Sequence, residues 1–209
     1  MTTKTESTAE GQAFKIKTAT IPIVGTSPLS FGRHHEESKH GENESHDQYE
    51  RRTFPEKTHY DHTTGEVYVP PLMFKKSLEV APAFLNLGTI PGKGSSTYTK
   101  FFLSALMITD PVYIGQKISD GRDEVLFVNP MGKRNSGTRV KRWFKTFDEW
   151  AGILKVTILN SDIVTEKIFE RVLIASGIFV GVGRFRPQNG GFYGRFKPNG
   201  EIIYEDLAI

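Results

Sequence analysis

Residues 153–185, ILKVTILNSDIVTEKIFERVLIASGIFVGVGRF, decide the predicted fold. Their first part, 153–159, is rich in aliphatic and β-branched side chains and predicts a strand. Apolar residues then recur at helical spacing behind candidate N-cap residues at 161–165, so a helix is expected next, with Gly177 at its C-terminus. Residues 178–182 predict a short strand that leads into a glycine-rich loop.

The chain before this stretch predicts the same order of strand and helix. Residues 14–24 alternate in polarity and carry β-branched side chains, which favours a strand. Residues 67–70 predict a strand that runs into Pro71, and the apolar side chains that follow are spaced as on one face of a helix. Pro82 should kink or end this helix early. Further strands are predicted over 101–114, 125–128 and 139–147.

The order of these elements predicts an α+β fold. The predicted order is strand, insertion, helix, several strands, helix and strand, which is the order of a ferredoxin-like βαββαβ core with additions. Residues 1–12 are expected to be a disordered tail, and residues 13–209 a single domain. Within it, residues 27–66 form a long polar insertion or arm that holds all six histidines. Extra β-hairpins complete the domain, including one over 192–204 that turns at Pro-Asn-Gly.

The composition limits the class of protein. The chain of 209 residues is 37% hydrophobic and has no cysteine, which excludes disulfides and thiolate metal sites. Its N-terminus lacks the apolar segment of a secretory signal, and no run reaches the roughly 18 apolar residues that span a bilayer. We therefore expect a cytoplasmic protein without membrane contact.

Positive charge is unevenly distributed along the chain, although the net charge is only +3. The windows 88–101, 132–147 and 181–198 cover 48 residues and hold 12 of the 27 Lys and Arg residues, but none of the 24 Asp and Glu residues. Such segregation creates a local positive potential of the kind that attracts nucleic acid. Chance clustering on solvated loops is the alternative.

The glycine-rich loop in the last window combines residue types that bind single strands. Residues 181–196 contain five glycines, three arginines and four aromatic residues. Arginine binds phosphates, and aromatic rings stack on bases for about 1–3 kcal/mol each without reading sequence. Alternatively, the glycines serve only a tight turn of the chain itself.

The other two windows have the same character. Residues 133–145 carry six cations beside Trp143 and Phe144, which alternatively only pack against a sheet. A loop with two lysines around an aromatic residue lies in the first window. The predicted nucleic-acid-binding residues are Lys93, Tyr98, Lys100, Lys133, Arg134, Arg139, Lys141, Arg142, Trp143, Lys145, Arg184, Phe185, Arg186 and Arg195.

The histidines of residues 27–66 lie among Asp and Glu residues, so a metal site or an acid–base pair is one interpretation. Their spacing matches no recognised ligand motif, and a solvated polar loop is the other interpretation. The sequence therefore predicts no catalytic residue, metal or cofactor.

The glycine pattern resembles that of the RAMP superfamily. Three segments carry this resemblance: Gly181-Val182-Gly183, a second glycine-rich step at 190–194, and the proline-led helix start at 69–78. Members of the superfamily include backbone subunits of CRISPR effector complexes, which bind single-stranded RNA. Some relatives cleave RNA with a loop histidine, but no histidine of this chain matches such a motif.

A second resemblance covers most of residues 20–197. Residues 90–101 and 181–196 are similar to those of a family of uncharacterised phage and prophage proteins. This resemblance implies a bacterial host cell but no established activity.

We therefore predict a non-enzymatic protein that binds single-stranded nucleic acid largely independently of sequence, with DNA favoured over RNA. We expect it to be a homo-oligomer that coats the strand in phage replication or recombination. The alternatives are an RNA-processing endoribonuclease that uses a loop histidine, and a phage structural or host-interaction protein.

Overall fold

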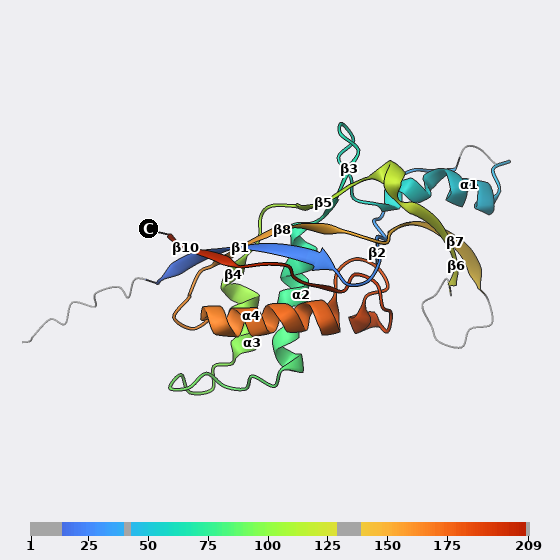
Figure 1. Ribbon diagram of the computed structural model, residues 1–209. Helices are drawn as coiled ribbons and strands as arrows, with labels where there is room; N and C mark the ends of the chain where they lie inside the picture. The colour runs from blue at the N-terminus through green and yellow to red at the C-terminus, as the bar shows by residue number, and fades with distance from the viewer. Residues whose placement is uncertain (1–13, 40–42, 129–138, 208–209) are drawn as a thin grey trace, which may run out of the picture.

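The computed structural model describes residues 14–39, 43–128 and 139–207 (Figure 1). Its largest sheet has the strand order β10-β1-β8-β4, and β9 also pairs with β1. All of these pairs are antiparallel. The strands are β1 (Ile16–Gly25), β4 (Leu106–Met107), β8 (Ala151–Ile158), β9 (Phe196–Pro198) and β10 (Ile203–Leu207).

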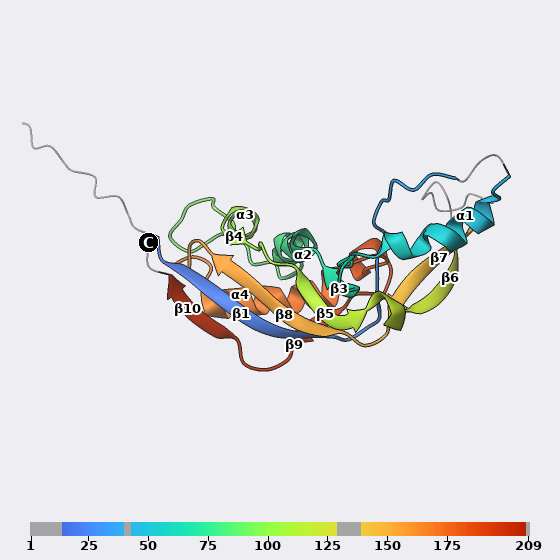
Figure 2. The same ribbon diagram turned by 90° about the horizontal axis from the view of Figure 1, so that it is seen from above.

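Three helices cover one side of this sheet (Figures 1 and 2). They are α2 (Pro71–Phe84), α3 (Tyr98–Ser104) and α4 (Glu166–Ala175). Alternate side chains of the central strands, such as Ile21 and Val156, are fully buried in one core with Leu78 of α2 and Phe169 of α4. The alternation in these strands is therefore the physical reason for a two-layer arrangement.

Two smaller sheets extend the molecule beyond this core. One contains β2 (Leu29–Ser30), β7 (Val140–Phe147) and β6 (Arg122–Val128), and the other pairs β3 (Glu66–Val69) with β5 (Val112–Lys117). The β6–β7 ribbon projects at one end of the molecule (Figure 1). Helix α1 (His46–Thr53) and the 3-10 turn Phe54–Lys57 lie against β7. The described part of residues 27–66 thus contains elements that cover the ribbon.

The mixed α+β class with antiparallel sheets agrees with the sequence prediction. The strands predicted at 14–24, 67–70, 125–128, 139–147 and 153–159 correspond to β1, β3, β6, β7 and β8. Helix α2 begins at Pro71 as expected and ends at Phe84, two residues after Pro82. Among the described residues, no helix is long and apolar enough to cross a membrane.

The strand predicted over 101–114 is wrong in its first half. Residues 98–104 form α3, which packs on α2. The rest of the predicted segment contains β4 and the start of β5. The ammonium group of Lys75 in α2 donates hydrogen bonds to the carbonyl oxygens of Phe102 and Leu103, at 2.9 and 2.6 Å. These contacts supply hydrogen-bond donors to carbonyl groups that have no partner at the carboxyl end of a helix. The packing of α3 on α2 thus overrides the strand preference of the Phe-Phe-Leu run.

The prediction of a strand at 178–182 is also wrong. Residues Ser176–Val180 form one π-helical turn that continues α4. Gly181, rather than Gly177, then takes a positive φ of 72° and ends the helix. Gly177 instead lies so close to the carbonyl oxygen of Phe196 that a Cβ would come within 1.9 Å of it.

The hairpin predicted over 192–204 is replaced by an interrupted edge strand. Both β9 and β10 pair with β1, Pro198 opposite Ile23 and Ile203 opposite Thr20. Pro198 ends β9, and the residues between it and Ile203 form a bulge in this edge, so the Pro-Asn-Gly sequence does not reverse the chain.

Candidate nucleic-acid interface

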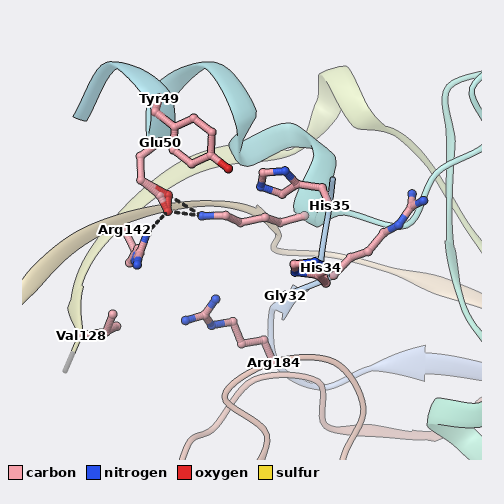
Figure 3. Close-up of a pocket in the computed structure, with 10 residues that line it drawn as sticks. Gly32, His34, His35, Tyr49, Glu50, Val128, Arg142 and Arg184 are labelled. Carbon is pink, nitrogen blue, oxygen red and sulfur yellow. Dashed lines mark hydrogen bonds and ion pairs between the residues drawn. The ribbon is translucent and has the colours of Figure 1, made fainter. Parts of the chain in front are cut away.

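A pocket of about 420 Å³ lies between the β6–β7 ribbon, α1 and the glycine-rich loop (Figure 3). A second pocket, of about 280 Å³, shares Gly32, Arg33 and Arg184 with it and continues to His59. We call the two joined pockets the cationic groove. Among the described residues, its charged lining consists of one acid, Glu50, and four cations: Arg33, Lys57, Arg142 and Arg184.

The glycine-rich loop forms one wall because its backbone is bound to the start of the domain. The amide of Arg184 donates to the carbonyl oxygen of Ser30 at 2.7 Å, and that of Gly194 to Pro28 at 2.7 Å. A Cβ on Gly194 would lie 1.8 Å from the carbonyl oxygen of Val182, and its φ is +68°. This glycine therefore serves the close approach of residues 194 and 182 to each other.

Arg184 projects from this wall into the groove (Figure 3). Its guanidinium carbon lies 3.8 Å from the ring centroid of Phe144 in β7 and 4.5 Å from that of Phe185. Burial, together with the positive charge of Arg142, lowers the pKa of Arg184 to about 10, while Glu50 opposes this shift. The group stays charged at neutral pH and forms no ion pair within the described residues.

Glu50 of α1 is the counter-charge on the opposite wall. Its side chain is 1% exposed and accepts hydrogen bonds from Lys57 at 2.6 Å and from Arg142 at 2.8 Å. Burial raises the pKa of Glu50, but the hydrogen bonds of the two cations outweigh it and leave the pKa below its ordinary value. Burial lowers the pKa of Lys57, the attraction of Glu50 opposes this, and the charges of Arg142 and Arg184 add to the lowering. One acid therefore holds α1 to β7 and neutralises part of the groove.

The other cations predicted on β7 also meet acids from elsewhere in the chain. Lys141 lies 3.6 Å from a carboxylate oxygen of Asp47, and Lys145 lies 2.5 Å from one of Asp123. Arg139 is exposed at the start of the described part of this segment. The positive charge of residues 139–147, a segment that contains no Asp or Glu, is thus partly neutralised by acids from other parts of the fold.

Trp143 is packed rather than free. Its ring lies 6.0 Å from that of Phe54, and the cations of Arg51 and Lys141 lie 4.8 and 4.9 Å from its centroid. Its indole N–H is buried and has no hydrogen-bond partner in the part of the chain that the structure describes. The ring is therefore already covered by protein groups.

The remaining arginines of the glycine-rich loop differ in their contacts. Arg195 donates hydrogen bonds from its guanidinium to the carbonyl oxygens of Ile178 and Phe192, at 3.2 and 3.1 Å, so it fastens the loop. Arg186 is half-buried, and its Nε–H has no partner among the described residues. Phe185, with a φ of 51°, packs edge-on against Phe144 at 5.8 Å.

The structure brings together only two of the three basic windows. Lys93, in the loop before α3, and Lys100, in α3, are exposed, whereas Tyr98 of α3 packs against the core. Figure 1 places α3 and the loop before it below the large sheet, away from the β6–β7 ribbon. Lys133 and Arg134 lie outside the described residues.

The groove also contains residues that sequence reasoning did not select. Arg33, Lys57 and His59 come from the polar segment that was assigned no site, and Glu50 comes from the same segment. Their sequence signal is only the density of charge and histidine between residues 27 and 66. No group of three His, Asp or Glu side chains suited to a metal ion occurs within the described ranges.

Neither a protein-family model nor a curated protein matches the sequence. Among solved structures, the chain is similar to a chain in the cryo-EM structure of the Type III-B Cmr-beta bound to cognate target RNA, with a TM-score of 0.51 and 13% identity. The match covers 91% of this chain and 61% of the other, so this chain spans about three fifths of its length. It is also similar to Cmr6 from Pyrococcus furiosus, with a TM-score of 0.48, 13% identity and coverage of 88% and 99%.

At this level of identity the likeness describes the fold and not the activity. The fold is therefore similar to that of the chain in the Cmr-beta structure.

Proposed function

We propose that this protein binds single-stranded nucleic acid, with little sequence preference, in the cationic groove. The observation that carries the proposal is Arg184, a half-buried guanidinium that is stacked on Phe144 and has no ion pair among the described residues. A desolvated cation of this kind is stabilised by an anion, and a phosphodiester is an anion that its planar fork fits. Arg33 and Arg142 supply further positive charge along the same groove.

The lining supports contact with the backbone of a strand more than reading of its bases. Cations on the groove walls neutralise phosphates, which gives affinity without sequence information. The Cmr-beta chain of similar fold was determined with target RNA, which favours testing RNA beside DNA. The preference for DNA, the coating of a strand by an oligomer and a role in phage replication remain predictions from the sequence.

We also infer a ferredoxin-like core. Its four strands would be β1, β4, β8 and β10, with α2 between the first two and α4 between the last two. Across the sheet they lie in the order β10-β1-β8-β4, that is, fourth, first, third and second along the chain. This order supports assigning the β6–β7 ribbon, the β3–β5 pair and α1 as additions to a βαββαβ unit.

A titration tests the proposed function. Fluorescently labelled single-stranded DNA, single-stranded RNA and duplex DNA of equal length are titrated at 50 and 200 mM salt, and the products are run on a gel. Three or four phosphate contacts predict that binding of single strands weakens roughly 20- to 50-fold over this range. Binding that is absent, or that does not change with salt, would reject the proposal.

An endoribonuclease is the second candidate, and one observation favours it. His34 and His35 line the same pocket as Lys57, Arg142 and Arg184, where a histidine could move protons beside a cation-bound phosphate. RNA cleavage that disappears in a His34→Ala or His35→Ala variant, while binding persists, would favour this candidate over a binding protein without catalysis.

A further inference from the structure

A row of aromatic rings leads from the core to the surface beside the cationic groove. The ring of Phe31, which is buried, lies 5.6 Å from that of His59. His59 lies 5.9 Å from Tyr68, and Tyr68 lies 5.8 Å from Tyr113. The last ring, that of Tyr113, is 44% exposed. The row therefore ends in an accessible aromatic face.

The second ring of this row, that of His59, belongs to the groove. His59 lines the second pocket together with Arg33 and Arg184. Burial and the charge of Arg33 lower the pKa of His59, so its imidazole is neutral at neutral pH and presents an uncharged ring. Cations and aromatic rings therefore meet at one continuous surface.

The outer end is held by strand pairing. Tyr68 of β3 and Tyr113 of β5 are opposite each other in the antiparallel register. Their strand neighbours Val67, Val69 and Val112 are buried, so the two tyrosines face away from the core. The backbone fixes both rings, and little conformational entropy is lost when a third ring stacks on them.

The hydroxyl groups of these two tyrosines are also free. Neither donates a hydrogen bond within the part of the chain that the structure describes, whereas the hydroxyls of Tyr60, Tyr193 and Tyr204 all bind carboxylates. A cross-strand pair that only stabilised β3 and β5 would need no continuation to His59 and the groove. The position of the row points to a ligand with both phosphates and flat rings.

We propose that Tyr113, Tyr68 and His59 form a platform on which bases of the bound strand stack, while its phosphates lie on Arg33 and Arg184. This inference rests on the proposed function of the groove. It adds a site for bases on the β3–β5 pair, outside the sequence windows that predicted the interface.

The test compares Tyr113→Ala with Tyr113→Phe, using normal and abasic single strands of equal length. Loss of one stacked base predicts that Tyr113→Ala binds the normal strand about 5- to 150-fold more weakly, with the same salt dependence. Tyr113→Phe should bind as the wild type does. The abasic strand, which keeps its phosphates, should bind the wild type and Tyr113→Ala equally.

Phe84→Ala is the matched control, because Phe84 is 47% exposed and also stacks on a neighbouring ring, but lies on the helix side of the molecule. It should bind both strands as the wild type does. If wild-type binding is salt-dependent and Tyr113→Ala is unchanged, the platform is rejected and the groove retained. If the wild type binds neither strand, the proposed function itself fails. A weakening that is equal for normal and abasic strands would indicate a structural role for Tyr113 and would overturn the platform.

Discussion

The guanidinium carbon of Arg184 lies 3.8 Å above the ring of Phe144, which links the glycine-rich loop to β7 across the cationic groove. The ring covers one face of the cation, and burial removes part of its hydration. The hydrogen-bond donors at the edge of the guanidinium remain directed into the pocket (Figure 3). The geometry presents a fixed cation to an anion that enters the groove.

We expect Arg184→Ala to weaken binding of single strands about tenfold or more, because a charge-assisted hydrogen bond is lost. The slope of log K against log salt should decrease by about 0.7, the value for one phosphate contact on a single strand. Arg184→Lys should keep the slope but lose part of the affinity, since lysine lacks the planar fork. Fluorescence anisotropy at four salt concentrations measures both quantities. An unchanged slope in Arg184→Ala would place the phosphates elsewhere.

The double variant Lys93→Ala/Lys100→Ala tests whether the third basic window takes part. Lys100 belongs to α3 and Lys93 to the loop before it, and both elements lie away from the groove, below the large sheet. We expect the same affinity and salt slope as in the wild type for strands that fill only the groove. A decrease in the slope of about 1.4 on a short strand would show that both lysines contact the same bound molecule.

The fold was predictable where a single pattern covers a whole element. The alternation in 14–24 and the aliphatic, β-branched run at 153–159 correspond to β1 and β8, and each of these strands buries one face. Residues 101–104 were mispredicted as strand because an aromatic run has the same composition in a strand and in a buried helix, and only the contact of α3 with α2 distinguishes them. The Pro-Asn-Gly turn signal was misleading for a similar reason, because β1 pairs with both segments that flank it.

The site was less predictable than the fold, because the net charge of a sequence window does not give the net charge around those residues in the folded protein. Residues 139–145 have no acid of their own, yet Asp47, Glu50 and Asp123 contact their cations. These partners lie far away along the chain, so no local pattern reveals them. Arg184, which the sequence analysis selected, lines the groove, whereas Arg33 and His59 are placed there only by the fold.

The carboxylate of Glu50 should be essential for stability. Glu50→Gln leaves Lys57 and Arg142 close together without their buried counter-charge, and we expect a loss in the unfolding free energy of about 3 kcal/mol. Urea unfolding at pH 7 measures this loss. Asp47→Asn is the matched control on the same helix, because its ion pair with Lys141 is exposed and should cost less than about 1 kcal/mol. Equal effects of both variants would contradict the structural role of Glu50.

The same group predicts an acid dependence of stability. The pKa of Glu50 is lower in the folded state than its ordinary value of 4.5, so the folded state favours the ionised form. Its contribution is therefore complete above pH 4.5 and is lost as the pH falls through the lowered pKa. The difference in unfolding free energy between the wild type and Glu50→Gln should shrink in this acidic range. A difference that stays constant from pH 7 to pH 3 would indicate that the carboxylate is not the source.

The last prediction separates two roles for the glycine-rich loop. Gly194→Ala combines a positive φ with a contact of 1.8 Å between the new Cβ and the carbonyl oxygen of Val182, whereas Gly92→Ala has the positive φ but open space around it. Strain alone should cost Gly92→Ala about 1–2 kcal/mol, and the backbone clash should make Gly194→Ala lose clearly more. Urea unfolding compares the two, and anisotropy measures binding by the folded fraction. If Gly194→Ala kept wild-type stability and lost only binding, its glycine would serve the approach of the nucleic acid and not the packing of the loop.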